Sequence, residues 1–130
     1  MADIRKSWGA ETQIEGSGGG WTTLSGTTEE YSADVDLETN GYEGAHVIVE
    51  VDADATPTDD VKVKIYGSLD GSNYDDTPMA QVTVDTATDP NQISIVVRDV
   101  AHCRLGFQQT GATDSHNVRA YYQAWRWQSV

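Results

Sequence analysis

The 130-residue sequence contains a single cysteine, Cys103. One cysteine excludes an intramolecular disulfide and any zinc site built from several cysteines. Cys103 lies within an alternating run of apolar residues, so we expect it to be a buried small hydrophobe and not a reactive thiol. The chain is long enough for one domain that buries a core without covalent cross-links.

Positive charge is also scarce. The sequence has 8 Lys and Arg against 21 Asp and Glu, which gives a formal net charge of −13. A protein that binds nucleic acid needs basic residues to neutralise the phosphates, and a protein that binds an anionic membrane surface needs them too. We therefore expect neither nucleic acid nor a membrane as a partner. Eleven acidic residues and no Lys or Arg lie between Glu29 and Asp60, whereas four arginines follow from Arg98 onward. This asymmetry predicts either a solvated acidic surface or two ends of opposite charge that favour self-assembly.

Long apolar runs are missing as well. No run approaches the length of a transmembrane helix, and the N-terminus has no apolar segment of the kind found in signal peptides, so we expect folding in a cytoplasm.

The first twenty residues, MADIRKSWGAETQIEGSGGG, show no strand alternation and end in a Gly-Ser tract that is flexible by itself. We predict an extended Gly-rich arm at residues 1–20, before a β-sandwich domain at residues 21–130. The arm is expected to contact another subunit through Ile4, Trp8 and Ile14. Packing of the arm on its own domain is the alternative.

Apolar and polar residues alternate with a period of two along most of the remaining chain. Seven runs carry a predicted inner face: YSADVDL, HVIVEVDA, VKVKI, AQVTV, QISIVV, HCRLGF and NVRAYYQAWRW. WTTL is a possible eighth, and Asn-Gly, Asp-Gly and Pro-Asn turn signals separate the runs. One apolar face per strand predicts an all-β fold, a β-sandwich of seven to eight mainly antiparallel strands, with the jelly roll as a candidate topology.

Two acidic loops, Asp52 to Asp60 and Asp70 to Asp76, are rich in the oxygen ligands that calcium prefers. Neither has the full EF-hand pattern, and Asp-Gly and Asn are also typical of tight turns. We interpret the second loop as a turn shaped by Asp70 and Gly71, with Tyr74 packed on the domain. Calcium binding at either loop stays open from the sequence.

Catalytic signatures are not found. The sequence contains no Gly-x-Ser-x-Gly and no His-Glu-x-x-His pattern, and the three histidines (His46, His102 and His116) have no metal-ligand spacing. We therefore predict a protein that is not an enzyme, with no catalytic residue, no metal and no cofactor.

The aromatic C-terminal run offers a binding surface. Tyr121, Trp125 and Trp127 fall on one face of the last predicted strand, beside Arg119. Such a face can contact another protein, bind a sugar or fill a second core layer. Because Arg119 shares the face with the tryptophans, we favour a protein interface formed by these four residues.

The order of three segments along the chain resembles that of a known group of proteins. VKIYGSLDGSNYDDTPMAQVTV, then QISIVVRDVAHCRLGFQQTGATD, then the closing aromatic strand resemble small virion proteins of tailed bacteriophages over residues 45–127. The resemblance implies a capsid cement (decoration) protein that binds the outer shell and stabilises contacts between capsid subunits. It also implies capsid or other virion proteins as partners, a homo-oligomer, and a place in a virion assembled in the host cytoplasm. It supplies no role for individual residues.

Two alternatives accompany this expectation. The first is a tail or neck component of the virion. The second, from another class of protein, is a carbohydrate-binding module that uses the C-terminal aromatic strand.

Overall fold

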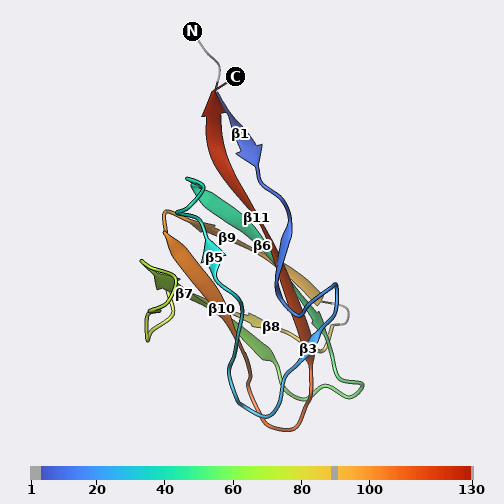
Figure 1. The fold of residues 1–130 in the computed structure, drawn as a ribbon. Coiled ribbons are helices and arrows are strands. Elements are labelled where there is room, and N and C mark those ends of the chain that lie inside the picture. The colour runs from blue at the N-terminus through green and yellow to red at the C-terminus, as the bar shows by residue number, and fades with distance from the viewer. Residues whose placement is uncertain (1–3, 89–90, 130) are drawn as a thin grey trace.

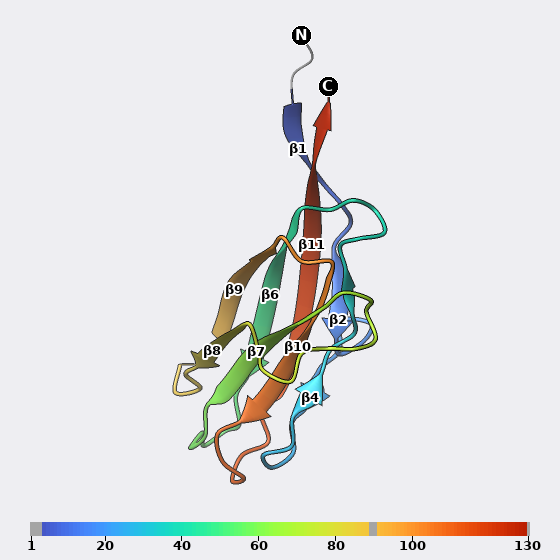
Figure 2. The same ribbon diagram turned by 90° about the vertical axis from the view of Figure 1, so that its left-hand side faces the viewer.

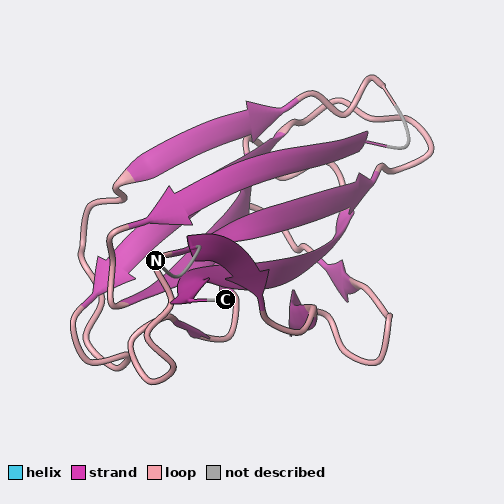
Figure 3. Cartoon of the chain, turned by 90° about the horizontal axis from the view of Figure 1, so that it is seen from above, coloured by secondary structure: helices cyan, strands magenta, loops and turns pink. Residues whose placement is uncertain are grey.

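The structure is a computed structural model that describes residues 4–88 and 91–129. Its strands, in chain order, are β1 (Ile4–Trp8), β2 (Thr12–Glu15), β3 (Thr22–Thr23), β4 (Glu30–Tyr31), β5 (Val35–Asp36), β6 (Gly44–Asp52), β7 (Val61–Ser68), β8 (Ala80–Val84), β9 (Asn91–Arg98), β10 (His102–Gln109) and β11 (Asn117–Ser129). Only strands and loops are found within the described residues (Figure 3). No helix in those ranges is long and apolar enough to cross a membrane.

The strands form two antiparallel sheets that pack against each other (Figures 1 and 2). One sheet has the order β1-β11-β6-β9, with β2 and β3 also paired to β11. The other has the order β4-β10-β7-β8, with β5 also paired to β10. β1, β2 and β3 pair with successive parts of β11, and β4 and β5 pair with successive parts of β10, so each set counts as one strand position and each sheet holds four positions. From β6 onward the chain crosses between the sheets at every connection except the β7–β8 hairpin, as in a jelly roll. The prediction of an all-β sandwich is confirmed.

Alternation explains the core between the two sheets. The predicted inner residues of the four central strands are almost all fully buried, and they are Val47, Val49 and Val51 of β6; Val61, Val63 and Ile65 of β7; Cys103, Leu105 and Phe107 of β10; and Val118, Ala120 and Ala124 of β11. Because side chains of a strand point alternately to its two faces, the intervening polar residues stay on the outer faces.

The alternation slips in the predicted run from Tyr31 to Leu37. Val35 and Leu37 are buried as expected, but Tyr31 is 42% exposed and Ser32 is buried in its place. The reason is that pairing stops between β4 and β5. The Ser32 hydroxyl accepts a hydrogen bond from the Leu105 amide at 2.9 Å, which satisfies a backbone group where the ladder is interrupted.

The second difference from the predicted alternation is found in β8, and its position at the edge of the sheet explains it. Ala80 and Val82 of β8 were expected on the inner face, yet both are exposed, Val82 by 40%. β8 is the last strand of its sheet. Only Val84, at its end, is covered by the core.

The N-terminal segment belongs to the sheet of its own domain. β1 and β2 both pair with β11, and Ile14 lies in the core at 5% exposure. The expected separation at residue 20 between an arm and a domain is therefore not seen, since residues 12–15 are part of the sandwich. The Gly-rich tract that follows is a turn in which Gln13 binds the Gly19 amide at 2.8 Å and the Gly20 carbonyl at 3.0 Å.

Candidate interaction surfaces

The first candidate surface is a two-stranded ribbon made of β1 and the end of β11. The register pairs Ile4 with Ser129 and Trp8 with Trp125. β6 begins at Gly44, opposite Trp125, so residues 126–129 run beyond β6, and among the described strands β1 is the one that pairs with them. Figures 1 and 2 show the ribbon projecting from the body, with the start of β1 and the end of β11 at its far end.

The two faces of the ribbon differ in chemistry. Residues directly opposite each other in an antiparallel pair point to the same side. By this rule one face carries Ile4, Lys6, Trp8, Trp125 and Trp127, and the other carries Arg5, Ser7, Arg126 and Gln128. The first face is apolar and aromatic around a single ammonium group. The second face is polar, and at its base Arg126 donates to the Asn40 carbonyl at 3.2 Å.

The aromatic face forms one cluster around Lys6. Its ammonium lies 4.4 Å from the ring centroid of Trp125 and about 6 Å from those of Trp8 and Trp127. Trp125 and Trp127 meet edge to face with centroids 5.5 Å apart. Trp125 is only 7% exposed, whereas Trp8 is 48% and Trp127 is 54% exposed. Contacts between Lys6 and the rings thus hold the cluster together. Its exposed part consists of the rings of Trp8 and Trp127 and of Ile4, which is 70% exposed.

Charge separates the ribbon from the body. Arg5, Lys6 and Arg126 lie in residues 4–8 and 125–129, which contain no acidic residue. Residues 9–124 hold five basic against 20 acidic side chains, a formal charge of −15. Of the four arginines from Arg98 onward, Arg126 lies in the ribbon, where Arg5 and Lys6 of β1 join it, and the other three lie in the body.

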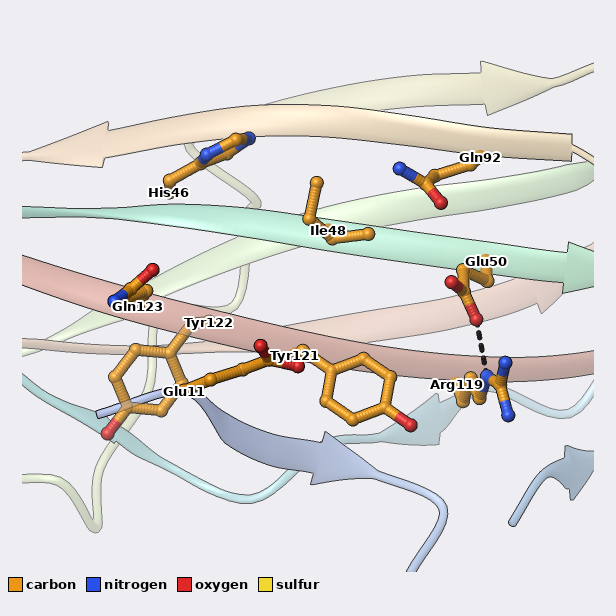
Figure 4. Close-up of a pocket in the computed structure, with 9 residues that line it drawn as sticks. All are labelled: Glu11, His46, Ile48, Glu50, Gln92, Arg119, Tyr121, Tyr122 and Gln123. Carbon is orange, nitrogen blue, oxygen red and sulfur yellow. Dashed lines mark hydrogen bonds and ion pairs between the residues drawn. The ribbon is translucent and has the colours of Figure 1, made fainter. Parts of the chain in front are cut away.

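The second candidate surface is a groove of about 400 Å³ on the outer face of the sheet that contains β6, β9 and β11. Figure 4 shows the side chains that line it: Glu11, His46, Ile48, Glu50, Gln92, Arg119, Tyr121, Tyr122 and Gln123. A smaller hollow of about 240 Å³ shares Glu50, Gln92 and Arg119 with the groove and adds Trp21.

Arg119 is held firmly between these two hollows. Its Nε donates to the Glu50 carboxylate, and its Nη1 donates to the Gly19 carbonyl at 2.7 Å. The guanidinium also lies 4.0 Å from the ring centroid of Trp21 and 5.9 Å from that of Tyr121. The hydrogen bond to Glu50 raises the pKa of Arg119, so the side chain is a permanent cation.

The residues predicted as an interface are therefore divided among three places. Ile4, Trp8, Trp125 and Trp127 lie in the ribbon, Arg119 and Tyr121 line the groove, and Ile14 lies in the core. Tyr121 and Trp127 are six residues apart, roughly 20 Å along an extended strand.

The sequence reasoning missed Lys6 and most of the groove. Lys6 is part of an alternating pattern, Ile4-Lys6-Trp8, that could have identified β1 as a strand. His46, Glu50 and Gln92 had no local signal beyond their outward positions in strands, because only the order of the strands brings them together.

The loop at Asp70 is a turn, as interpreted from the sequence. The Asp70 carboxylate accepts hydrogen bonds from the Ser72 and Asn73 amides, both at 2.8 Å, and these bonds hold its pKa well below the ordinary value. Gly71 has a φ of 78°, which suits glycine. Tyr74 packs on the domain, where its hydroxyl donates to Asp34 at 2.7 Å.

Asp59 of the other acidic loop and Asp114, between β10 and β11, also bind backbone amides. Asp59 Oδ2 accepts from the Thr113 and Asp114 amides, and Asp114 Oδ2 accepts from the Thr58 and Asp59 amides. These bonds lower the pKa of Asp114. Within residues 4–88 and 91–129, no group of three or more His, Cys, Asp or Glu side chains is placed to hold a metal ion.

Comparison with known proteins supports the fold class. No protein-family model matches the chain. No curated protein matches it either. Among solved structures, the chain is similar to the crystal structure of the Yersinia pseudotuberculosis-derived mitogen (YPM), with a TM-score of 0.50 and 8% sequence identity over 93% of this chain and 86% of that chain. A likeness at this identity shows a shared β-rich fold alone, so the resemblance to phage virion proteins stays a prediction.

Proposed function

We propose that this protein is a structural component of a tailed-phage virion, a capsid cement protein that attaches to the outer shell through the β1/β11 ribbon. The observation that carries the proposal is the ribbon itself. Trp8 and Trp127 are both about half exposed on an element that projects from an acidic body. Large exposed aromatic side chains on one face are typical of protein contacts and are costly to leave in water.

The open edges of the ribbon support attachment to another protein. β1 is the first strand of its sheet, and residues 126–129 of β11 lie beyond β6. Along these edges the described residues supply no strand that would pair with the ribbon. Such edges can accept a strand from a partner, which adds backbone hydrogen bonds to the contacts of the side chains.

The charge distribution favours the outside of a particle. A body with a formal charge of −15 over residues 9–124 is repelled by packaged DNA and suits the outer surface, while the basic ribbon suits an acidic and apolar receiving site. Many copies on one particle would multiply a modest energy per site. Attachment to the tail or neck is the alternative location, and the same ribbon would serve there. We also propose that copies of this chain form homo-oligomers on the shell.

Co-sedimentation with expanded, empty heads of the phage that carries this sequence tests the proposal. Trp127→Ser is expected to weaken attachment by about thirtyfold, since a central tryptophan anchor contributes about 2 kcal/mol or more. Trp8→Ser should act in the same direction. Leu69→Ser is the matched control, because Leu69 is 87% exposed but lies in the loop after β7, outside the ribbon.

The Trp125→Ala substitution should act differently from substitutions at Trp8 and Trp127. Since Trp125 is covered by Lys6 and Trp127, Trp125→Ala disorders the cluster and does not simply remove a contact. The sandwich should keep its circular dichroism spectrum, because Trp125 is outside the core cluster. Attachment of Trp127→Ser at the wild-type level would disprove the role of the ribbon. Binding to purified tails and not to heads would move the protein to the alternative location.

A further inference from the structure

We propose that the groove over β9, β6 and β11 is a binding site for a neutral oligosaccharide. The proposal goes beyond attachment to a virion, since it concerns a different surface and a different class of ligand. It begins from the order of side chains across the three strands.

Cross-strand pairing sets the outer face of the sheet in three rows. The first row is Gln92, Glu50 and Arg119; the second is Ser94, Ile48 and Tyr121; the third is Val96, His46 and Gln123. Neighbouring rows are two residues apart along each strand, roughly 7 Å. The floor of the groove is therefore an apolar centre, Ile48 with Tyr121, between polar groups on either side (Figure 4).

This order matches the chemistry of a sugar ring. The C–H groups of a pyranose form an apolar face that packs on an aromatic ring, while the hydroxyl groups point outward from the ring edge. Each hydroxyl both donates and accepts, so it pairs with carboxylates, amides, imidazole and guanidinium alike. Gln92, Glu50 and Arg119 would meet the hydroxyls on one side, and His46 and Gln123 those on the other.

Most of the polar groups are available for a ligand. The Gln123 amide nitrogen donates to the Gly9 carbonyl at 2.9 Å and Glu50 Oε2 accepts from Arg119, so a ligand can bind the amide oxygen of Gln123 and the other carboxylate oxygen of Glu50. The side chains of His46, Gln92 and Glu11, and the hydroxyl of Tyr121, make no hydrogen bond to another residue in the described parts of the chain. Arg119 uses its Nε and one Nη1 hydrogen in the fold, which leaves further N–H groups of its guanidinium free to donate. The bonds to Glu50 and Gly19 fix the guanidinium before a ligand binds, which lowers the entropy lost on binding.

The charge of the groove and the length of the surface around it restrict the class of ligand. Glu11 and Glu50 against Arg119 give the groove a formal charge of −1 with His46 neutral, and the whole chain is at −13, so an anionic sugar is disfavoured. The adjoining hollow extends the surface to Trp21, which is 40% exposed. A ligand of more than one sugar unit could therefore contact Tyr121 at one point and Trp21 at the next.

The test uses an array of immobilised neutral and acidic oligosaccharides, followed by calorimetric titration of the neutral glycans that bind. We expect binding of neutral glycans that Tyr121→Ala lowers by at least about tenfold and Gln92→Ala lowers as well, while Tyr121→Phe keeps most of the affinity. Val96→Ala is the matched control, because Val96 is 67% exposed on the same face of β9 but does not line the groove.

Three results would overturn the proposal: no neutral glycan bound at millimolar concentration, binding of acidic glycans only, or binding that Tyr121→Ala and Gln92→Ala leave unchanged. Circular dichroism checks that each variant is folded, and if Tyr121→Ala is not, Gln92→Ala and His46→Ala decide the outcome. Failure here is distinct from failure of the ribbon, since Trp127→Ser should keep glycan binding and Tyr121→Ala should keep attachment to heads.

Discussion

His102 Nδ1 lies 2.7 Å from Asp34 Oδ2, and this contact joins β10 to the loop between β4 and β5. The other ring nitrogen lies 3.1 Å from a Glu38 carboxylate oxygen, and Asp36 is 3.8 Å from Nδ1. Both ring nitrogens face carboxylates, so the doubly protonated imidazolium satisfies both contacts at once. The hydrogen bond to Asp34 is the main cause of a raised pKa at His102.

The first prediction is a pH dependence of stability. Because the folded pKa of His102 lies above the unfolded value of 6.5, the stabilisation is complete below that value and is lost as pH rises through the folded pKa. The melting temperature should therefore fall as the pH rises above 6.5, through the raised pKa of His102. His102→Gln should flatten this slope, because it removes the imidazole whose pKa is raised. An unchanged slope in His102→Gln would contradict the assignment.

The second prediction distinguishes the two N-terminal strands. Removing residues 1–8 should leave a cooperatively folded sandwich, because β1 pairs only with the projecting end of β11. Removing residues 1–20 should destabilise it strongly, because Ile14 and its strand are lost from the core. Ile14→Ala is expected to cost about 2–5 kcal/mol in chemical denaturation. Ile4→Ala, at a position that is 70% exposed, should change the free energy of unfolding by less than about 0.5 kcal/mol.

The third prediction concerns Cys103. The side chain is fully buried in the core, and burial raises the pKa of its thiol to about 12. A thiol-specific reagent should leave the native protein unmodified near neutral pH, because the thiolate is the reactive form. The same reagent should label one thiol per chain in denaturant. Rapid labelling without denaturant would show that β10 opens locally.

The fourth prediction is that calcium has no effect on stability. The Asp70 carboxylate is occupied by backbone amides and by the Asn73 side chain, so it need not bind a metal. A ligand specific for the folded state at a hundredfold excess over its dissociation constant would add about 2.7 kcal/mol. Melting curves with calcium and with a chelator should coincide instead. Asp70→Ala should lower the melting temperature equally in both, and a shift of several degrees on chelation would establish a metal site.

Local patterning was sufficient for the sandwich and for its turn at Asp70. The alternation in β6, β7, β10 and β11 identifies residues that point inward, because a strand has a period of two whatever its neighbours are. Asp70, Gly71 and Asn73 identify the turn, because its hydrogen bonds lie within four residues. The burial of Cys103 follows from its place in the same pattern.

Tertiary structure decided which of the outward residues meet. Gln92, Glu50 and Arg119 are far apart in the chain and become one row only because β9, β6 and β11 are neighbours in a sheet. The local alternation pattern does not determine strand order, because the order is set by pairing between segments that are far apart in the sequence. Likewise Trp125 and Trp127 share a face by sequence, but Trp125 lies opposite Gly44 of β6 and is buried, whereas Trp127 lies beyond β6 and is exposed. The sequence alone therefore determined the class of fold and the inward faces, and long-range pairing decided the ribbon and the groove.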